Sequence, residues 1–219
     1  MPLSQATQDY LKVIFKIRQR RGRVTTSALA QGMGVSAASA TNMVKRLVRR
    51  RLVRHTPYRT VELTADGEKA ALEIIRHHRL LELFLRDHLG LALDQVHGEA
   101  ETLEHVLSEE VESRIAALMG HPTADPHGDP IPSKAGALAD VTHPRLSDLA
   151  RGQEGRIARV SDEHGPQLRR LTVLGLVPGA RVVITDRRPG GVRVRLADGR
   201  RRRVPAALAR AVFIVPGAV

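Results

Sequence analysis

The first sixty residues divide into segments of helical hydrophobic spacing separated by short polar breaks. Apolar residues recur three and four positions apart over residues 4–21, which predicts a helix. A short second helix follows, which Thr26 or Ser27 can cap, and a turn at Gly34 separates it from a third helix that begins at Ser36. Helix, glycine-containing turn, helix is the pattern of a helix-turn-helix.

The segment "LVRHTPYRTVELT", residues 52–64, changes to strand-like spacing. It predicts two short strands on either side of a Pro-Tyr-Arg tip. A hairpin directly after a helix-turn-helix is a wing. We therefore expect a winged helix-turn-helix at the N-terminal end of the chain.

Helical spacing returns over residues 65–89 and again over residues 97–119. A small helical unit with an unpartnered apolar stripe commonly buries it against a second copy of itself. A helix-turn-helix protein also needs two recognition helices about 34 Å apart to reach successive major grooves. We therefore expect a homodimer. The stripe of the second helix consists of Leu103, Val106, Leu107, Val111, Ile115 and Leu118.

The hydrophobic period changes to two in the C-terminal part. Residues 120–144 are rich in Pro, Gly and Asp and predict a linker. Short alternating segments follow, with Asp198-Gly199 as a hairpin turn, and they predict a small β-barrel. Alternation would place Arg201 and Arg203 on one face, which we interpret as solvated. A barrel that binds peptide segments is the alternative.

The expected fold class is thus mainly α with a small all-β C-terminal domain. The 219 residues contain no cysteine, which excludes disulfides, thiolate metal ligands and a cysteine nucleophile. Neither a signal peptide nor an apolar run of membrane-spanning length is evident, so we expect a cytoplasmic protein that does not enter a membrane.

Charge is distributed in blocks along the chain. Residues 1–60 hold thirteen Lys and Arg against one acidic residue, residues 61–130 hold five against fifteen, and residues 131–219 hold seventeen against seven. The basic N-terminal block around the helix-turn-helix predicts a polyanionic partner, which for this motif is double-stranded DNA. The acidic middle block must have a different role.

The third helix leaves a polar face after its apolar side is packed. Small polar side chains at its N-terminal end can contact base edges, and the basic groups of Arg46, Arg49 and Arg59 can contact phosphates. A solvated polar face is the alternative interpretation. The predicted DNA-contacting residues are Ser36, Ser39, Thr41, Asn42, Arg46 and Arg59, with Lys45 beside them.

Histidine and glutamate recur at four-residue spacing in the acidic block. His97, Glu101 and His105 would share one helical face, with Glu104 beside them. His78 and Glu82 form a second pair with the same spacing. Such a pair can bind a divalent ion, although a solvated ion pair has the same spacing. Two such rows in one region favour metal binding.

The block "HHRLLELFLRDHLGLALDQVHGEAETLEHVLSEEVESRI" resembles the diphtheria-toxin-repressor family of metal-dependent transcription regulators. The similarity extends to "GDPIP" and to the N-terminal "ATQDYLKVIF", and "LRRLTVLGLVPGARV" is similar to the family's SH3-like, iron-transport-A-like domain. The resemblance implies a winged helix-turn-helix domain over residues 1–72, a helical metal-binding and dimerisation domain over 73–142, and an SH3-like domain over 143–219.

The resemblance also implies two metal sites. The primary, activating site falls on Asp9, Glu101, Glu104 and His105. The ancillary site falls on His78, Glu82 and His97, completed by His164 and Gln167, with Glu163 as the substitute if the register shifts by one.

The residue types at two primary positions point to the metal. Iron-responsive members of the family carry sulfur ligands at the positions of Asp9 and Glu101, where this chain has carboxylates. Oxygen donors favour the harder Mn²⁺, with Fe²⁺ as the second candidate. The manganese-responsive branch without a third domain carries a glutamate at the position of Lys12, so this chain departs from that branch.

The sequence therefore predicts a Mn²⁺-activated repressor, not an enzyme, that binds operator DNA as a homodimer and controls metal-uptake genes. An Fe²⁺-dependent repressor of the same family and a metal-independent winged-helix regulator are the alternatives. A metalloenzyme with the same ligands would need an open coordination position and a general base, and no motif of that kind accompanies the cluster.

Overall fold

The computed structural model describes residues 3–56, 60–161 and 165–217. They form two compact units. The first comprises residues 1–77, 104–107 and 132–138, and the second comprises residues 78–103, 108–131 and 139–219. The chain thus passes between the units several times, and α4 (Ala65–Asp87) belongs to both.

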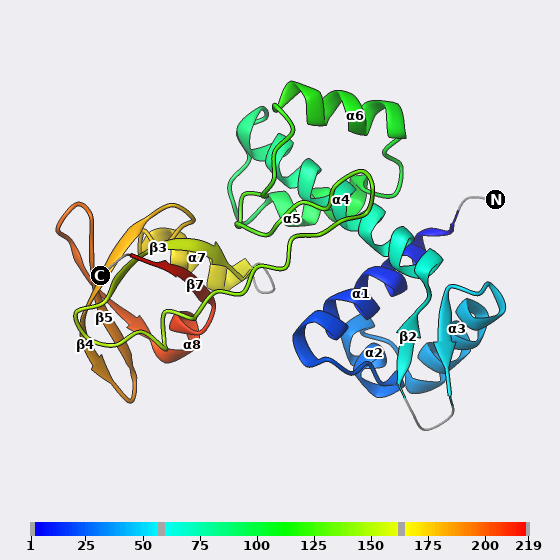
Figure 1. Ribbon diagram of the computed structural model, residues 1–219, viewed down its shortest axis with the longest axis horizontal. Coiled ribbons are helices and arrows are strands. Elements are labelled where there is room, and N and C mark those ends of the chain that lie inside the picture. The colour runs from blue at the N-terminus through cyan, green and yellow to red at the C-terminus, as the bar shows by residue number, and fades with distance from the viewer. Residues whose placement is uncertain (1–2, 57–59, 162–164, 218–219) are drawn as a thin grey trace. The chain divides into compact units, whose positions relative to one another are not determined.

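The first unit contains α1 (Gln5–Arg21), α2 (Thr26–Met33) and α3 (Ala37–Arg49), with β1 (Val53–His55) and β2 (Val61–Leu63) beside them (Figure 1). One core unites these elements with the first half of α4. The buried residues of this core are Tyr10, Leu11, Ile14, Phe15, Val24, Leu29, Val44, Leu47, Leu52, Val53, Val61, Ala71, Leu72 and Ile75.

Local signals determine the helix-turn-helix. The Thr25 hydroxyl accepts the backbone N–H of Ala28 and caps α2, one residue before the predicted caps. Gly34 ends α2 with a φ of 63°, a conformation that glycine adopts without strain. Ser36 caps α3 as predicted, because its hydroxyl accepts the N–H of Ser39.

The wing is an antiparallel pair. Val53 faces Leu63, and His55 faces Val61. The backbone N–H of Val61 also donates to the carbonyl of Val24 at 2.8 Å, which attaches the wing to the segment before α2. The predicted tip, residues 57–59, lies outside the described residues and includes Arg59.

The prediction of one helix over residues 97–119 is wrong. Two helices occupy this segment, α5 (Val96–Leu103) and α6 (Glu109–Leu118). Ser108 caps α6, since its hydroxyl accepts the N–H of Val111 at 3.3 Å, and three glutamates follow in the first turn, where the helix dipole favours negative charge. His105 therefore lies in the turn after α5 and does not share a helical face with His97.

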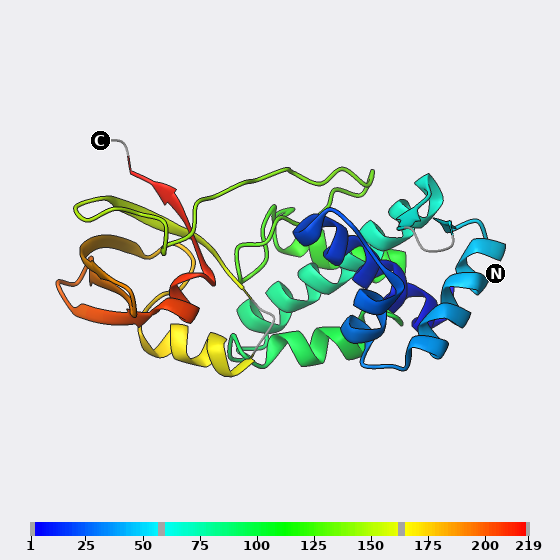
Figure 2. The same ribbon diagram turned by 90° about the horizontal axis from the view of Figure 1, so that it is seen from below.

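The C-terminal part of the second unit is a five-stranded antiparallel sheet in the order β6-β5-β4-β3-β7. The strands are β3 (Glu154–Val160), β4 (Arg181–Arg188), β5 (Gly191–Leu196), β6 (Arg201–Pro205) and β7 (Val212–Pro216). Two helices, α7 (Gly165–Val173) and α8 (Ala206–Ala209), pack with the sheet. Figure 2 shows that the chain runs extended through the segment that precedes the sheet. Alternate residues along the strands point inward and form the core of this sheet, for example Val182 on β4, Val194 on β5 and Ile214 on β7.

The predicted fold class is confirmed: a helical winged helix-turn-helix and middle region precede a small all-β domain. Among the described residues, no helix is both long enough and apolar enough to cross a membrane.

Candidate metal centre

His105 is the centre of a cluster in the first unit. Its Nε2 lies 3.0 Å from Oδ1 of Asp9 on α1 and 3.5 Å from Oε1 of Glu104. Its Nδ1 lies 2.8 Å from the amide oxygen of Gln8, which can only accept, so Nδ1 carries a hydrogen. In the neutral ring the lone pair of Nε2 then faces two carboxylates, an arrangement suited to a divalent cation.

Lys12 is a second cationic neighbour of Glu104. Its Nζ donates to Oε1 of Glu104, the same oxygen that faces His105, and both side chains are buried. The Lys12 ammonium therefore already supplies one positive charge to Glu104. Because the lysine lies on α1, it connects the turn after α5 to the helix that packs against the helix-turn-helix.

The second cluster connects α4 with α5. Oε1 of Glu82 lies 3.0 Å from Nε2 of His78 and 3.0 Å from Nδ1 of His97. The two ring nitrogens are 3.1 Å apart. His78 and Glu82 are buried, and His97 is half-buried. Three donor atoms at this mutual spacing can share one cation at ligand distances of about 2.0–2.2 Å. The structure thus brings together the three ancillary residues that lie in the helices.

Glu101 lies beside these histidines. Its Oε1 is 3.7 Å from Nε2 of His97 and 3.9 Å from Nδ1 of His78. His97 and Glu101 are four residues apart on α5, as the sequence spacing predicted. The structure brings three of the predicted primary residues together around His105, and it places the fourth, Glu101, next to the second cluster.

A third group contains residues that the sequence analysis missed. Asp125 and His127 lie with Glu82 in a fully buried cluster. Nδ1 of His127 is 3.5 Å from Oε2 of Glu82, whereas Nε2 of His127 lies 3.3 Å from the carbonyl of Leu93 and can donate to it. That bond would leave the Nδ1 lone pair aimed at a carboxylate oxygen. Oε2 of Glu82 accepts no hydrogen bond from the residues that the structure describes. This donor set fits a cation between Glu82, Asp125 and His127.

The loop that carries Asp125 and His127 is held rigidly within the second unit. Oδ1 of Asp125 accepts the N–H groups of His127 and Asp129, at 2.8 and 2.9 Å. The carbonyl of His127 accepts the N–H of Val160 on β3 at 2.9 Å. Gly128 has a φ of 88°, and a Cβ there would lie 2.0 Å from the carbonyl oxygen of Ala158. The loop therefore lies directly on the sheet domain.

The pKa of Glu82 lies well below its usual value. Burial alone would raise it, but the charge of His78 and the contacts with His127, His78 and His97 outweigh burial. An ionised Glu82 at the meeting point of three imidazoles keeps both carboxylate oxygens available as metal ligands.

The pKa of Asp125 shifts in the opposite direction, to about 8. Burial is the main cause, and the negative charges of Glu82 and Asp129 add to it, against the opposing charges of His127 and Arg79. Asp125 is therefore protonated at neutral pH and would have to release a proton to coordinate a metal ion.

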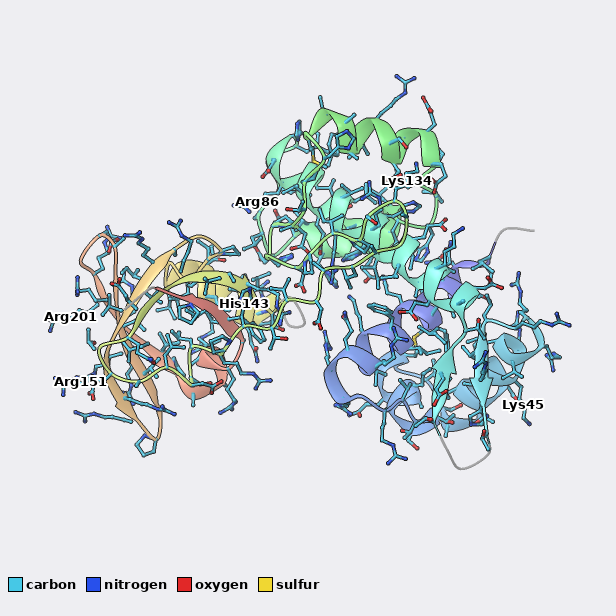
Figure 3. The ribbon with its side chains drawn as sticks, in the orientation of Figure 1. Lys45, Arg86, Lys134, His143, Arg151 and Arg201 are labelled. Atoms are coloured by element: carbon cyan, nitrogen blue, oxygen red, sulfur yellow. The ribbon has the colours of Figure 1, made fainter. Side chains whose placement is uncertain are left out.

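All the predicted DNA-contacting residues except Arg59, which lies outside the described residues, lie on α3 or at its start. Ser36 and Ser39 are exposed at its start and bond to each other, and the Thr41 hydroxyl donates to the carbonyl of Ala37 at 2.7 Å. Asn42 and Arg46 are exposed farther along the helix. Figure 3 shows Lys45 pointing away from the body of the first unit. These groups can face a DNA groove without rearrangement of the core.

The structure describes one of the two ligands that we predicted from the sheet domain. Gln167 is half-buried in α7, near its start, whereas His164 and its substitute Glu163 lie outside the described residues. The assignment of these ligands stays a prediction.

Known protein families match successive parts of the chain. "Iron dependent repressor, N-terminal DNA binding domain" matches residues 2–61, "Iron dependent repressor, metal binding and dimerisation domain" matches residues 64–133, and "FeoA domain" matches residues 145–216. The iron-dependent repressor IdeR of Mycobacterium tuberculosis is 32% identical, with 97% of each chain covered. The chain belongs to the iron-dependent repressor family. The diphtheria toxin repressor of Corynebacterium efficiens is 33% identical over 76% of this chain and 69% of that protein.

Solved structures of iron-dependent repressor relatives include manganese proteins. A structure described as a manganese-dependent transcriptional repressor in complex with manganese has a TM-score of 0.88, is 38% identical, and is matched over 96% of this chain and 99% of its own. The manganese regulator SloR has a TM-score of 0.77 and is 28% identical, with 96% and 98% covered. The family thus consists of metal-dependent transcriptional repressors, with iron-dependent and manganese-dependent forms.

Proposed function

We propose that this chain is a Mn²⁺-activated repressor that binds operator DNA as a homodimer and controls metal-uptake genes. The observation that carries the proposal is the chemistry of the donor groups. The three clusters described above offer carboxylate oxygens and imidazole nitrogens as ligands. Such donors suit Mn²⁺, whereas softer ions gain most from sulfur ligands. The manganese-bound relative supports this choice.

The primary ligands are Asp9, Glu104 and His105, with Glu101 as the fourth. A bound divalent ion would supply positive charge that relieves the repulsion between Asp9 and Glu104. Asp9 lies on α1, which packs against α2 and β2, and Glu104 and His105 lie in the turn after α5. These residues hold α1 in one position relative to that turn, and α1 in turn supports the helix-turn-helix.

A homodimer would present two copies of α3 to DNA. Val111 and Leu118 lie seven residues apart on one face of α6, and their side chains are 46% and 65% exposed. Leu103 at the end of α5 is also exposed. Exposed large aliphatic side chains of this kind favour burial against a second copy. The domain boundaries at residues 72 and 142 belong to this proposal. The boundary at 142 falls between the matches to residues 64–133 and 145–216, whereas the match to residues 64–133 begins eight residues before 72.

The proposal is tested by selecting duplex DNA from a random pool with the metal-loaded protein. The dissociation constant of the selected duplex is then measured in Mn²⁺, Fe²⁺, Zn²⁺ and chelator. We expect Mn²⁺ to tighten binding about 5- to 150-fold relative to chelator, the usual range of coupling between two sites. A larger gain with Fe²⁺ would make the protein an iron-dependent repressor. Equal binding in chelator and in every metal would contradict metal activation altogether.

Metal binding at Glu82, Asp125 and His127 should depend on pH. Because the pKa of Asp125 is about 8, a metal ion displaces a proton below that pH. We expect the Mn²⁺ affinity of this group to rise about tenfold per pH unit up to about pH 8 and to level off above it. Calorimetric titration in buffers with different ionisation enthalpies measures the released proton. Asp125→Asn should abolish the release; a variant that still releases one proton would show that another group titrates.

A further inference from the structure

The outward face of strands β5 and β6 carries opposed arginines. Arg193 faces Arg203 across the two strands, and Arg195 faces Arg201. All four are exposed, and on β5 they alternate with buried valines. The alternation in the sequence predicted that Arg201 and Arg203 share one face. The pairing of β5 with β6 adds Arg193 and Arg195 to that face. We call Arg193, Arg195, Arg201 and Arg203 the arginine face.

A third opposed pair lies on the same sheet. Arg156 on β3 faces Arg181 on β4, and both are exposed. The strands β6, β5, β4 and β3 are neighbours in that order, so outward guanidinium groups occur on four successive strands. Acidic residues on this side are Glu154, which precedes Arg156 by two positions, and Asp186, which pairs with Arg193 in the register.

Positive charge on the arginine face is mostly uncompensated. Arg193 lies 3.9 Å from Asp186. Among the residues that the structure describes, Arg195, Arg201 and Arg203 form no ion pair with an acidic side chain. Like charges directly opposite each other on a sheet destabilise it. The face therefore becomes more stable when an anion binds to it.

We propose that the arginine face contacts the phosphate backbone of duplex DNA. The inference rests on the proposed DNA binding. Guanidinium groups bind phosphate oxygens in pairs of parallel hydrogen bonds. Two residues along a strand are about 6.7 Å apart and neighbouring strands about 4.8 Å, so the four groups form a compact array suited to several phosphates rather than one.

The composition of the face favours DNA over other anionic partners. A protein interface would place aromatic or aliphatic anchors among the charges, and a membrane-binding surface would add exposed apolar side chains. On the described strands of this sheet, the exposed large aliphatic side chain is that of Val215 on β7, which β4 and β3 separate from β5, and the valines between the arginines of β5 point into the core. Because α3 and the arginine face belong to one chain, a duplex bound by α3 meets the face at a raised effective concentration.

The test compares two triple variants of the full chain. Arg195→Gln/Arg201→Gln/Arg203→Gln removes three charges from the face, and Arg151→Gln/Arg170→Gln/Arg210→Gln removes three exposed charges elsewhere on the same domain. Figure 3 shows Arg201 and Arg151 projecting from this domain. The dissociation constant of a mixed-sequence duplex is measured against salt concentration, with Mn²⁺ and with chelator.

Each lost phosphate contact lowers the slope of log affinity against log salt by about 0.9. We call the triple variant at Arg195, Arg201 and Arg203 the face variant. We expect its slope of log affinity against log salt to fall by about 2 to 3, and that of the control variant to fall by less than about 1. Equal slopes for the face variant and the unchanged protein would overturn the proposal. Should the triple variant fail to fold, Arg201→Gln alone, with an expected loss of about 0.9, decides the question.

Two further measurements distinguish DNA contact by the arginine face from metal activation and from membrane binding. The slope comparison in chelator needs no metal activation, so it can succeed where the proposed manganese response fails. Vesicles of phosphatidylglycerol serve as the competing anionic surface. If the face variant lost vesicle binding but kept its DNA slope, the arginine face would belong to a membrane contact and the proposal would be wrong.

Discussion

Glu104→Ala is expected to lower the free energy of unfolding by about 3–5 kcal/mol and to abolish the metal response of DNA binding. The stability loss arises because Lys12, which is buried, would lose the Glu104 carboxylate to which it donates. The loss of response arises because Glu104 is also a proposed primary ligand beside His105. Urea unfolding measures the first effect, and DNA binding with Mn²⁺ and with chelator measures the second.

A double variant separates the two effects. Lys12→Met/Glu104→Leu removes both charges, and replacing a buried ion pair by apolar residues is often neutral or stabilising. We expect this variant to unfold at a urea concentration close to that of the unchanged protein and still to ignore Mn²⁺. A double variant that recovered the metal response would show that Glu104 is structural only.

A matched control comes from another ion pair on α1. Arg18 and Glu68 form a pair whose side chains are 35% and 40% exposed. Because partly exposed pairs contribute little, Glu68→Ala should cost less than about 1 kcal/mol and leave the metal response intact. The contrast between Glu104 and Glu68 isolates burial and ligand position from the general effect of removing a glutamate.

Much of the fold could be predicted because its signals are local. A glycine turn followed by a serine cap and an apolar stripe defines α3 within fifteen residues. The alternation of the C-terminal strands gave the outward positions of Arg201 and Arg203 for the same reason. Such features need only the spacing of neighbouring residues.

The break between α5 and α6 illustrates what hydrophobic spacing conceals. Aliphatic residues continue at helical intervals through the turn, from Leu103 to Val106 and Val111, so periodicity predicts one helix. The usable signal was Ser108, a capping residue followed by glutamates at positions that a helix start favours. Because helix ends depend on single caps, they are easily missed in a continuous apolar pattern.

The third ligand group could not be derived from spacing. Glu82 lies on α4 and His127 lies in a loop forty-five residues later, and only the tertiary structure brings them together. The segment "DPHGDPIP" did place an aspartate and a histidine two residues apart between proline and glycine, which indicates a fixed loop. The prediction of primary and ancillary residues came from the family resemblance, which supplied their long-range pairing.

Gly128→Ala is expected to weaken Mn²⁺ binding at Glu82, Asp125 and His127 by about 10- to 100-fold, the usual effect of disturbing groups that orient ligands. Gly128 is not a ligand. An added Cβ would lie 2.0 Å from the carbonyl oxygen of Ala158, and the φ of 88° adds backbone strain. The loop must then move away from β3, and Asp125 and His127 must move with it.

Gly136→Ala provides the control for backbone strain. Gly136 has a φ of 80°, and nothing lies within 4 Å of its added Cβ, so the substitution repeats the strain without the collision. Gly136→Ala should lose about 1–2 kcal/mol of stability from the backbone conformation, and Gly128→Ala should lose more because it also displaces the loop. Only Gly128→Ala should lose Mn²⁺ affinity in calorimetric titration. Equal affinities for the two variants would mean that contact with the sheet domain does not position Asp125 and His127.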